Sequence, residues 1–152
     1  MIDFHNPEAF FSTLKKISPK DQPQFGLMTP QHMVEHLILL VKISNGKIPQ
    51  LLIFSVEKAE KWKQRLLYTD MEFPKDIKAP GLPQDSLLEL HFENLTEAIE
   101  KLENEIIDFF SYFQNNSGVH TTHPILGELN ELEWTLFHSK HFTHHFKQFG
   151  LI

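Results

Sequence analysis

The 152-residue sequence contains no cysteine, and this absence limits its chemistry. Disulfides, thiolate zinc sites and cysteine nucleophiles are excluded, so a protein-bound metal has to use histidine or carboxylate ligands. The sequence also has no basic run. It contains 14 lysine and arginine residues and 20 aspartate and glutamate residues, which gives a net charge of −6. A nucleic-acid partner is therefore not expected.

Long apolar runs are absent as well. No segment carries the roughly 20 apolar residues that a membrane-spanning helix needs, and the N-terminus has no basic region followed by an apolar stretch. We therefore expect a soluble, cytoplasmic protein without a membrane partner. The length fits one domain, residues 1–152, and 14 phenylalanines against two tyrosines predict a core of large rings.

Helix start signals occur at four places, each combining a capping side chain with proline or glutamate in the first turn. They predict helices over about residues 7–17, 30–45, 95–115 and 131–149. The second of these is apolar on most sides, which is typical of a central helix.

The connection between the second and third predicted helices is long. A short accessory helix is expected over about residues 55–67, which are rich in helix formers. Residues 69–85 contain three prolines and no helical period, so we expect an irregular crossover loop that forms the rim of a site and selects the substrate. No convincing strand pairing is seen. The fold class predicted is all-α, an antiparallel-type four-helix bundle with an accessory short helix and a long crossover loop.

Four of the ten histidines fall in one eight-residue stretch of the last predicted helix, from His138 to His145. At 100° per residue, His141 and His145 fall near the middle of its apolar face, one turn apart, whereas His144 falls at the polar edge and is expected to be solvated. Two imidazoles at this spacing can bind one metal ion through their ring nitrogens. Because buried histidines are also common as hydrogen-bonded core residues, the pair alone leaves both interpretations open.

A third ligand would decide between them, and His36 is the candidate. It lies on the buried side of the second predicted helix, beside Leu40 and Ile43. With His141 and His145 it would complete a three-histidine set that leaves coordination positions open, as in catalytic metal sites. Zinc, nickel or iron would fit these nitrogens, and metal affinity is predicted to fall as the pH drops through about 6.5, the usual histidine pKa.

Three segments carry a family resemblance: Leu27-Met-Thr-Pro-Gln-His-Met-Val-Glu-His-Leu37, His123-Pro-Ile-Leu-Gly-Glu-Leu-Asn-Glu-Leu-Glu-Trp134 and Lys140-His-Phe-Thr-His-His-Phe-Lys-Gln-Phe-Gly150. They resemble the DinB/YfiT-like superfamily, in particular a branch of unassigned function. The resemblance covers most of the chain and is strongest at residues 27–41 and 123–150.

This resemblance implies a four-helix bundle with a metal held by one histidine of the second helix and a His-x-x-x-His pair of the last. Those ligands correspond to His36, His141 and His145. Similar proteins include metal-dependent thiol transferases and a mycothiol-dependent isomerase, so a small-molecule or thiol substrate is implied, and a homodimer is possible. No motif here matches the residues that bind the thiol cosubstrate, and no catalytic residue is assigned.

Other interpretations stay open. His32-Met-Val-Glu35-His36 matches the inverted zincin pattern of a peptidase, with Glu35 as general base, although Glu35 shares an arc with Gln31 as a solvated residue would. His138 and His123 are reserve ligands, the latter more suited to orienting the loop before the last helix. A non-catalytic metal- or ligand-binding bundle, and a helical interaction protein without metal, are the alternatives to an enzyme.

Overall fold

The computed structural model describes residues 1–75 and 87–152, which contain five helices and one small β-hairpin. In chain order the elements are α1 (Pro7–Leu14), α2 (Pro30–Ser44), α3 (Val56–Tyr68), α4 (Leu95–Asn115), β1 (Thr121–His123), β2 (Gly127–Leu129) and α5 (Glu131–Gln148). The described chain is therefore mostly helical, as the sequence predicts. Residues 76–86, which include the expected crossover from 76 to 85, lie outside the described residues.

The predicted helix starts are confirmed, because each capping side chain binds a backbone amide in the first turn. Asn94 and Asn130 accept from the amides of Glu97 and Glu133, both at 2.9 Å. The Glu133 carboxylate binds the Asn130 amide in return, which completes a capping box at the start of α5. This cap fixes where α5 begins and therefore which face each of its histidines occupies.

The first helix is shorter than predicted. It ends at Leu14 rather than Ile17, because the amides of Lys16 and Ile17 bond three residues back, to Thr13 and Leu14. Ser18-Pro19 follows, and the residue before a proline is disfavoured in a helical conformation. The tight turn therefore replaces the last helical turn.

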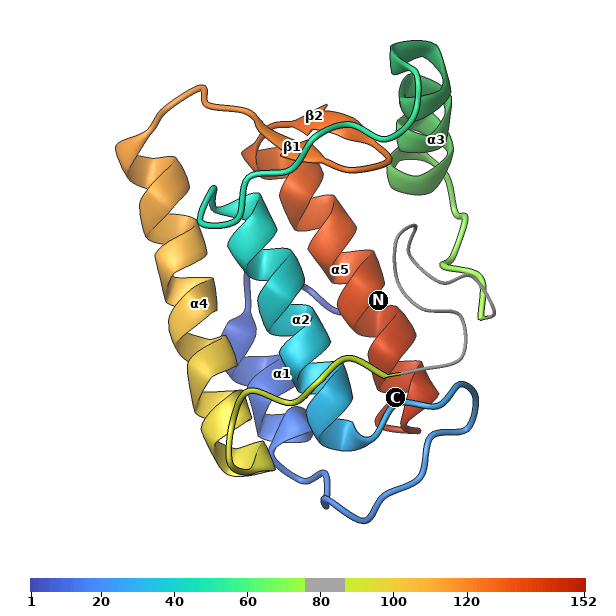
Figure 1. Cartoon of the computed structure of the whole chain (residues 1–152), viewed down its shortest axis with the longest axis vertical. Coiled ribbons are helices and arrows are strands. Elements are labelled where there is room, and N and C mark those ends of the chain that lie inside the picture. The colour runs from blue at the N-terminus through green and yellow to red at the C-terminus, as the bar shows by residue number, and fades with distance from the viewer. Residues whose placement is uncertain (76–86) are drawn as a thin grey trace.

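Three long helices lie side by side in Figure 1, in the order α4, α2, α5. The colours show that α2 and α4 run in the same direction and α5 in the opposite one. Antiparallel packing, as predicted, therefore holds for α2 and α5. It does not hold for α2 and α4, because the long connection between them carries the chain back to the end at which α2 started.

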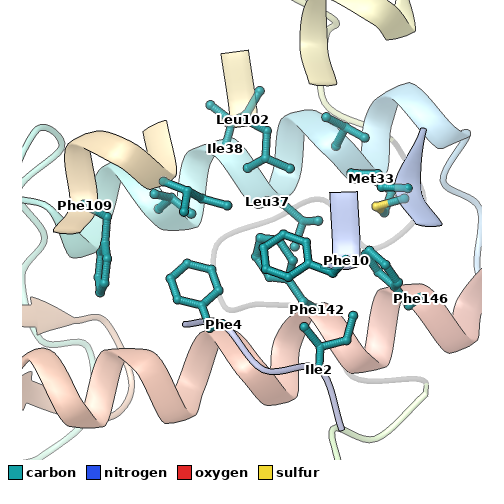
Figure 2. Packing of buried hydrophobic residues seen from close by; sticks show 14 of the residues in the cluster. Ile2, Phe4, Phe10, Met33, Leu37, Ile38, Leu102, Phe109, Phe142 and Phe146 are labelled. Atoms are coloured by element: carbon teal, nitrogen blue, oxygen red, sulfur yellow. The ribbon is translucent and has the colours of Figure 1, made fainter. Parts of the chain in front are cut away.

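The core is rich in phenylalanine, as expected. Figure 2 shows Phe4, Phe10 and Phe142 gathered between α2 and α5, and all three are buried. The Phe4 ring stacks on His138 with centroids 4.7 Å apart, so the N-terminal segment contributes to the core although it is not helical.

The N-terminal segment also covers the flank of α5 that the sequence placed on the polar side. The amide of Ile2 donates to Thr143 Oγ1 at 2.8 Å, and that of Phe4 donates to Ser139 Oγ at 3.3 Å. Both acceptors are buried. Thus α5 is enclosed on more sides than its apolar stripe indicates.

A hairpin that the sequence did not predict packs at the end of α2. β1 and β2 pair antiparallel, with Thr121 opposite Leu129. Thr121 Oγ1 donates to the carbonyl of Ser44 at 2.8 Å and accepts from the indole of Trp134 at 2.7 Å. Strands of three residues show little alternation in sequence, so tertiary hydrogen bonds rather than a local pattern define them.

None of the described helices is both long and apolar enough to span a membrane.

Candidate metal centre

Three histidines from two helices bring ring nitrogens together. The Nε2 atom of His141 on α5 lies 3.0 Å from Nε2 of His36 on α2 and 3.1 Å from Nε2 of His145, one turn further along α5. One ligand atom from each of the three lies within 4.8 Å of the others. The set predicted from the sequence is therefore assembled in space, with His36 and His141 separated by 105 positions in the chain.

The three side chains differ in their exposure. His141 and His145 are buried, with 5% and 4% of their surface exposed, whereas His36 is partly exposed. The cluster consequently lies at the edge of the α2–α5 contact and not deep in the core.

Gln148 fixes the orientation of one imidazole. Its amide nitrogen donates to the carbonyl of Phe25 at 3.0 Å, so its amide oxygen faces His145 Nδ1, 2.7 Å away. His145 therefore carries its proton on Nδ1, and its Nε2 presents a lone pair to the cluster. Metal-ligating histidines usually make such a hydrogen bond through the ring nitrogen that does not bind the metal.

The donor set fits a divalent metal ion. In a tetrahedral site with nitrogen ligands at 2.0–2.1 Å, the ligand atoms are about 3.3 Å apart, close to the 3.0 and 3.1 Å observed. A single proton on His141 Nε2 cannot form a good hydrogen bond to both neighbours, whereas a metal ion accepts three lone pairs at once. Within the described residues, Nδ1 of His36 and of His141 is buried without a partner, so His145 alone of the three has the second hydrogen bond that ligand histidines usually make.

Burial keeps the three ligands neutral, as metal binding requires. Burial, aided by the nearby His144, lowers the pKa of His36 to about 4. Burial and the neighbouring histidines also hold the pKa of His141 and of His145 well below the ordinary value of 6.5. All three are therefore unprotonated at neutral pH.

Aromatic rings flank the cluster. The His141 ring lies 5.2 Å from the ring of Phe137 and 5.3 Å from that of Phe73, between centroids. Phe137 belongs to α5, whereas Phe73 belongs to the irregular segment after α3. The surroundings of the three ligands are thus apolar on this side.

His144 is outside the ligand set, as expected, but it is not fully solvated. Its ring is partly buried between those of Phe25 and Phe73, with centroids 5.3 and 5.9 Å away. Burial lowers the pKa of His144, and the backbone of Phe73 offsets part of this effect. The segment after α3 covers this edge of α5. Its path cannot be predicted from sequence periodicity, because the segment is irregular.

The reserve candidates have structural partners elsewhere. Nδ1 of His123 accepts from the amides of Ile125 and Leu126, both at 3.2 Å, so this residue orients the hairpin turn as expected. His138 Nε2 donates to the hydroxyl of Ser44 at 2.9 Å, because that hydroxyl itself donates to a backbone carbonyl. Neither histidine joins the three ligands.

The inverted zincin arrangement finds no support in the geometry. The Glu35 carboxylate accepts from the amides of His91 and Phe92 at 2.8 and 3.1 Å, so it fastens the segment before α4. His32 Nδ1 lies 2.6 Å from the capping hydroxyl of Thr29. Among residues 1–75 and 87–152, only His36, His141 and His145 form a group able to hold a metal.

Two residues of the site escaped the sequence analysis. Gln148 follows His145 by three residues, so helical spacing could have identified it as a partner. Phe73 gives no such signal, because it lies in an irregular segment whose path only the tertiary structure determines.

Comparison of the chain with known protein families, curated proteins and solved structures finds no match.

Proposed function

We propose that this chain is a metal-dependent enzyme of the DinB/YfiT-like superfamily, a four-helix bundle with one accessory helix, in which His36, His141 and His145 hold one divalent ion. The observation that carries the proposal is the convergence of three neutral Nε2 atoms at 3.0 and 3.1 Å. Zinc, nickel and iron all suit three imidazole nitrogens.

The reaction proposed is a thiol transfer or a hydrolysis on a small molecule. A divalent ion on three imidazoles lowers the pKa of a thiol or water and so supplies a nucleophile near neutral pH. Three protein ligands, with one of them partly exposed, support an open rather than a closed site. A cytoplasmic location, a small-molecule or thiol partner and a possible homodimer belong to the same proposal.

The first test is metal content. Protein produced without a histidine tag and purified without a nickel column should contain one equivalent of a divalent metal by elemental analysis. Substituting any one ligand, as in His36→Ala, His141→Ala or His145→Ala, should abolish stoichiometric binding, because two imidazoles hold a metal weakly. His144→Ala is the matched control and should retain the metal. An equal loss in His144→Ala would contradict the assignment of ligands.

The second test separates an enzyme from a non-catalytic metal-binding bundle. Cobalt-substituted protein should change its visible absorption on titration with 2-mercaptoethanol, because an open coordination position allows the thiol to bind. A spectrum that does not respond, together with unfolding when the metal is removed, would favour a structural metal instead.

A further inference from the structure

Three side chains on one edge of α5 hold the segment that follows α3. Lys140 donates through Nζ to the carbonyls of Thr69 and Met71, the latter at 3.0 Å. Lys147 Nζ binds the Glu72 carboxylate at 2.7 Å. His144 between them packs its ring against that of Phe73, with centroids 5.9 Å apart.

These three positions form a stripe along the helix. Lys140, His144 and Lys147 are separated by four and then three residues, so they lie within about 60° of one another around α5. All three side chains are polar, and the sequence predicts that His144 is solvated. In the structure they instead contact four residues of the segment after α3: Thr69, Met71, Glu72 and Phe73.

The consequence of this fastening is the position of one ring. Phe73 lies against the imidazole of His141 at 5.3 Å and against Phe137 at 5.6 Å, between centroids, in edge or tilted contacts. It is partly buried and packs against the hydrophobic core. Thus a partly exposed stripe of polar side chains holds an apolar ring beside a metal-ligand candidate.

The charges around the cluster indicate what would bind there. Within the described part of the chain, other histidines are the titratable groups that act on the pKa of His36, His141 and His145, and no carboxylate does. Three neutral imidazoles leave the charge of a divalent ion uncompensated. A ligand with an anionic head group is therefore favoured, and the adjacent rings favour an apolar body.

We propose that Phe73 is a specificity-determining residue that packs against the apolar, preferably aromatic, body of a small thiol whose sulfur binds the metal, and that Lys140, His144 and Lys147 position it. This inference rests on the proposed function, because it requires the metal on the three histidines. When the thiol binds, its S–H bond breaks, the proton goes to solvent and the sulfur lone pair binds the ion.

The test compares two thiols of similar acidity, phenylmethanethiol and 2-mercaptoethanol, by calorimetry on the zinc-loaded full chain. The wild-type protein should bind phenylmethanethiol more tightly. Phe73→Ala should weaken phenylmethanethiol binding roughly threefold to tenfold, the range expected for the loss of one aromatic contact. Affinity for 2-mercaptoethanol and for zinc should stay within about twofold, since Phe73 donates no ligand to the metal.

Two kinds of control keep the result specific. Phe54→Ala removes another partly exposed phenylalanine, in the segment before α3, and should change neither thiol. Lys140→Met and Lys147→Met should reduce the preference for phenylmethanethiol, as Phe73→Ala does. Phe73→Tyr, which replaces one aromatic ring by another, should keep the preference that Phe73→Ala loses. A purely structural role of the lysines would lower the melting temperature without changing this preference.

The outcomes separate the two proposals. Wild-type protein that binds no zinc would overturn the proposed function and this inference with it. Wild-type protein that binds zinc but shows no preference between the thiols overturns the role of Phe73 alone. A Phe73→Ala variant that loses both thiols equally, or neither, does the same.

Discussion

Gln148 and His145 are joined by a hydrogen bond of 2.7 Å between amide oxygen and Nδ1, and this contact determines which nitrogen of His145 faces the other two histidines. The Gln148 side-chain amide cannot rotate by half a turn without losing its other hydrogen bond, from its nitrogen to the carbonyl of Phe25. One buried side chain thus connects the loop before α2 with the orientation of a proposed metal ligand.

Gln148→Leu should lower zinc affinity about tenfold to 100-fold, the usual effect of removing a partner that orients a ligand histidine. Gln148→Glu keeps an oxygen acceptor for His145 and should bind zinc more tightly than the leucine variant. Competition with a chromogenic chelator measures both affinities. If leucine and glutamate variants bind zinc equally, the hydrogen bond has no part in metal binding.

The pH dependence of zinc binding should be shifted to lower pH than the sequence alone predicts. Burial lowers the pKa of His36 to about 4 and keeps those of His141 and His145 well below 6.5. Protons therefore compete with the metal on the folded chain only at a pH well below 6.5. Chelator competition between pH 7 and pH 5, corrected for protonation of the chelator, should show nearly constant affinity. A tenfold loss between pH 7 and pH 6 would indicate that the ligands are more hydrated than in the structure.

Acid should destabilise the fold through His123. Burial lowers its pKa to about 3, below the ordinary 6.5 that applies to the unfolded chain. Between these values the unfolded chain binds a proton that the folded chain does not, so stability is lost as the pH falls through this window, by about 1.4 kcal/mol per pH unit.

The His123→Asn variant tests this effect, because its amide oxygen can still accept from the turn amides but cannot titrate. Urea unfolding at pH 7, 6 and 5 should show a smaller slope than in the wild-type protein, and the difference should approach about 1.4 kcal/mol per pH unit below pH 6. His120→Gln, at an exposed position of the same connection, is the control and should keep the wild-type slope. Equal slopes in the wild-type and His123→Asn proteins would refute the assignment.

Glu105 should contribute to stability although it resembles an ordinary surface acid in the sequence. Its side chain is fully buried and binds Lys47 and Lys101, each at 2.7 Å. Burial raises its pKa, but the two ammonium groups more than offset this and leave the pKa below its ordinary value.

Glu105→Gln should therefore lower the free energy of unfolding by about 1–3 kcal/mol, because hydrogen bonds to a charged group are lost inside the fold. Glu100→Gln, on the exposed side of α4, should change it by less than about 0.5 kcal/mol. Chemical denaturation at pH 7 compares the two variants. A loss of equal size in both would show that the buried position of Glu105 confers no special stability.

Local chemistry made the helices predictable. Asn130 and Glu133 define the start of α5 in sequence because the capping box uses only neighbouring atoms. The same holds for the relation of His141 to His145, since one helical turn places them together whatever the rest of the fold does.

Contacts between distant segments account for what the sequence did not reveal. Ser139 and Thr143 are polar and read as solvent-facing, but the N-terminal segment supplies amide donors that satisfy their hydroxyls and so permits their burial. The hairpin and the buried carboxylate of Glu105 depend in the same way on partners far away in sequence.

The sequence by itself determined the helical class, the helix starts and the three histidines, because these follow from hydrogen bonds within a turn and from the period of the helix. Only the tertiary structure decided that Nε2 of His36 meets Nε2 of His141, that Gln148 orients His145, and that Phe73 lies beside them. The physical reason is that each of these contacts requires two segments to pack at a particular distance and rotation, which periodicity within a single segment does not encode.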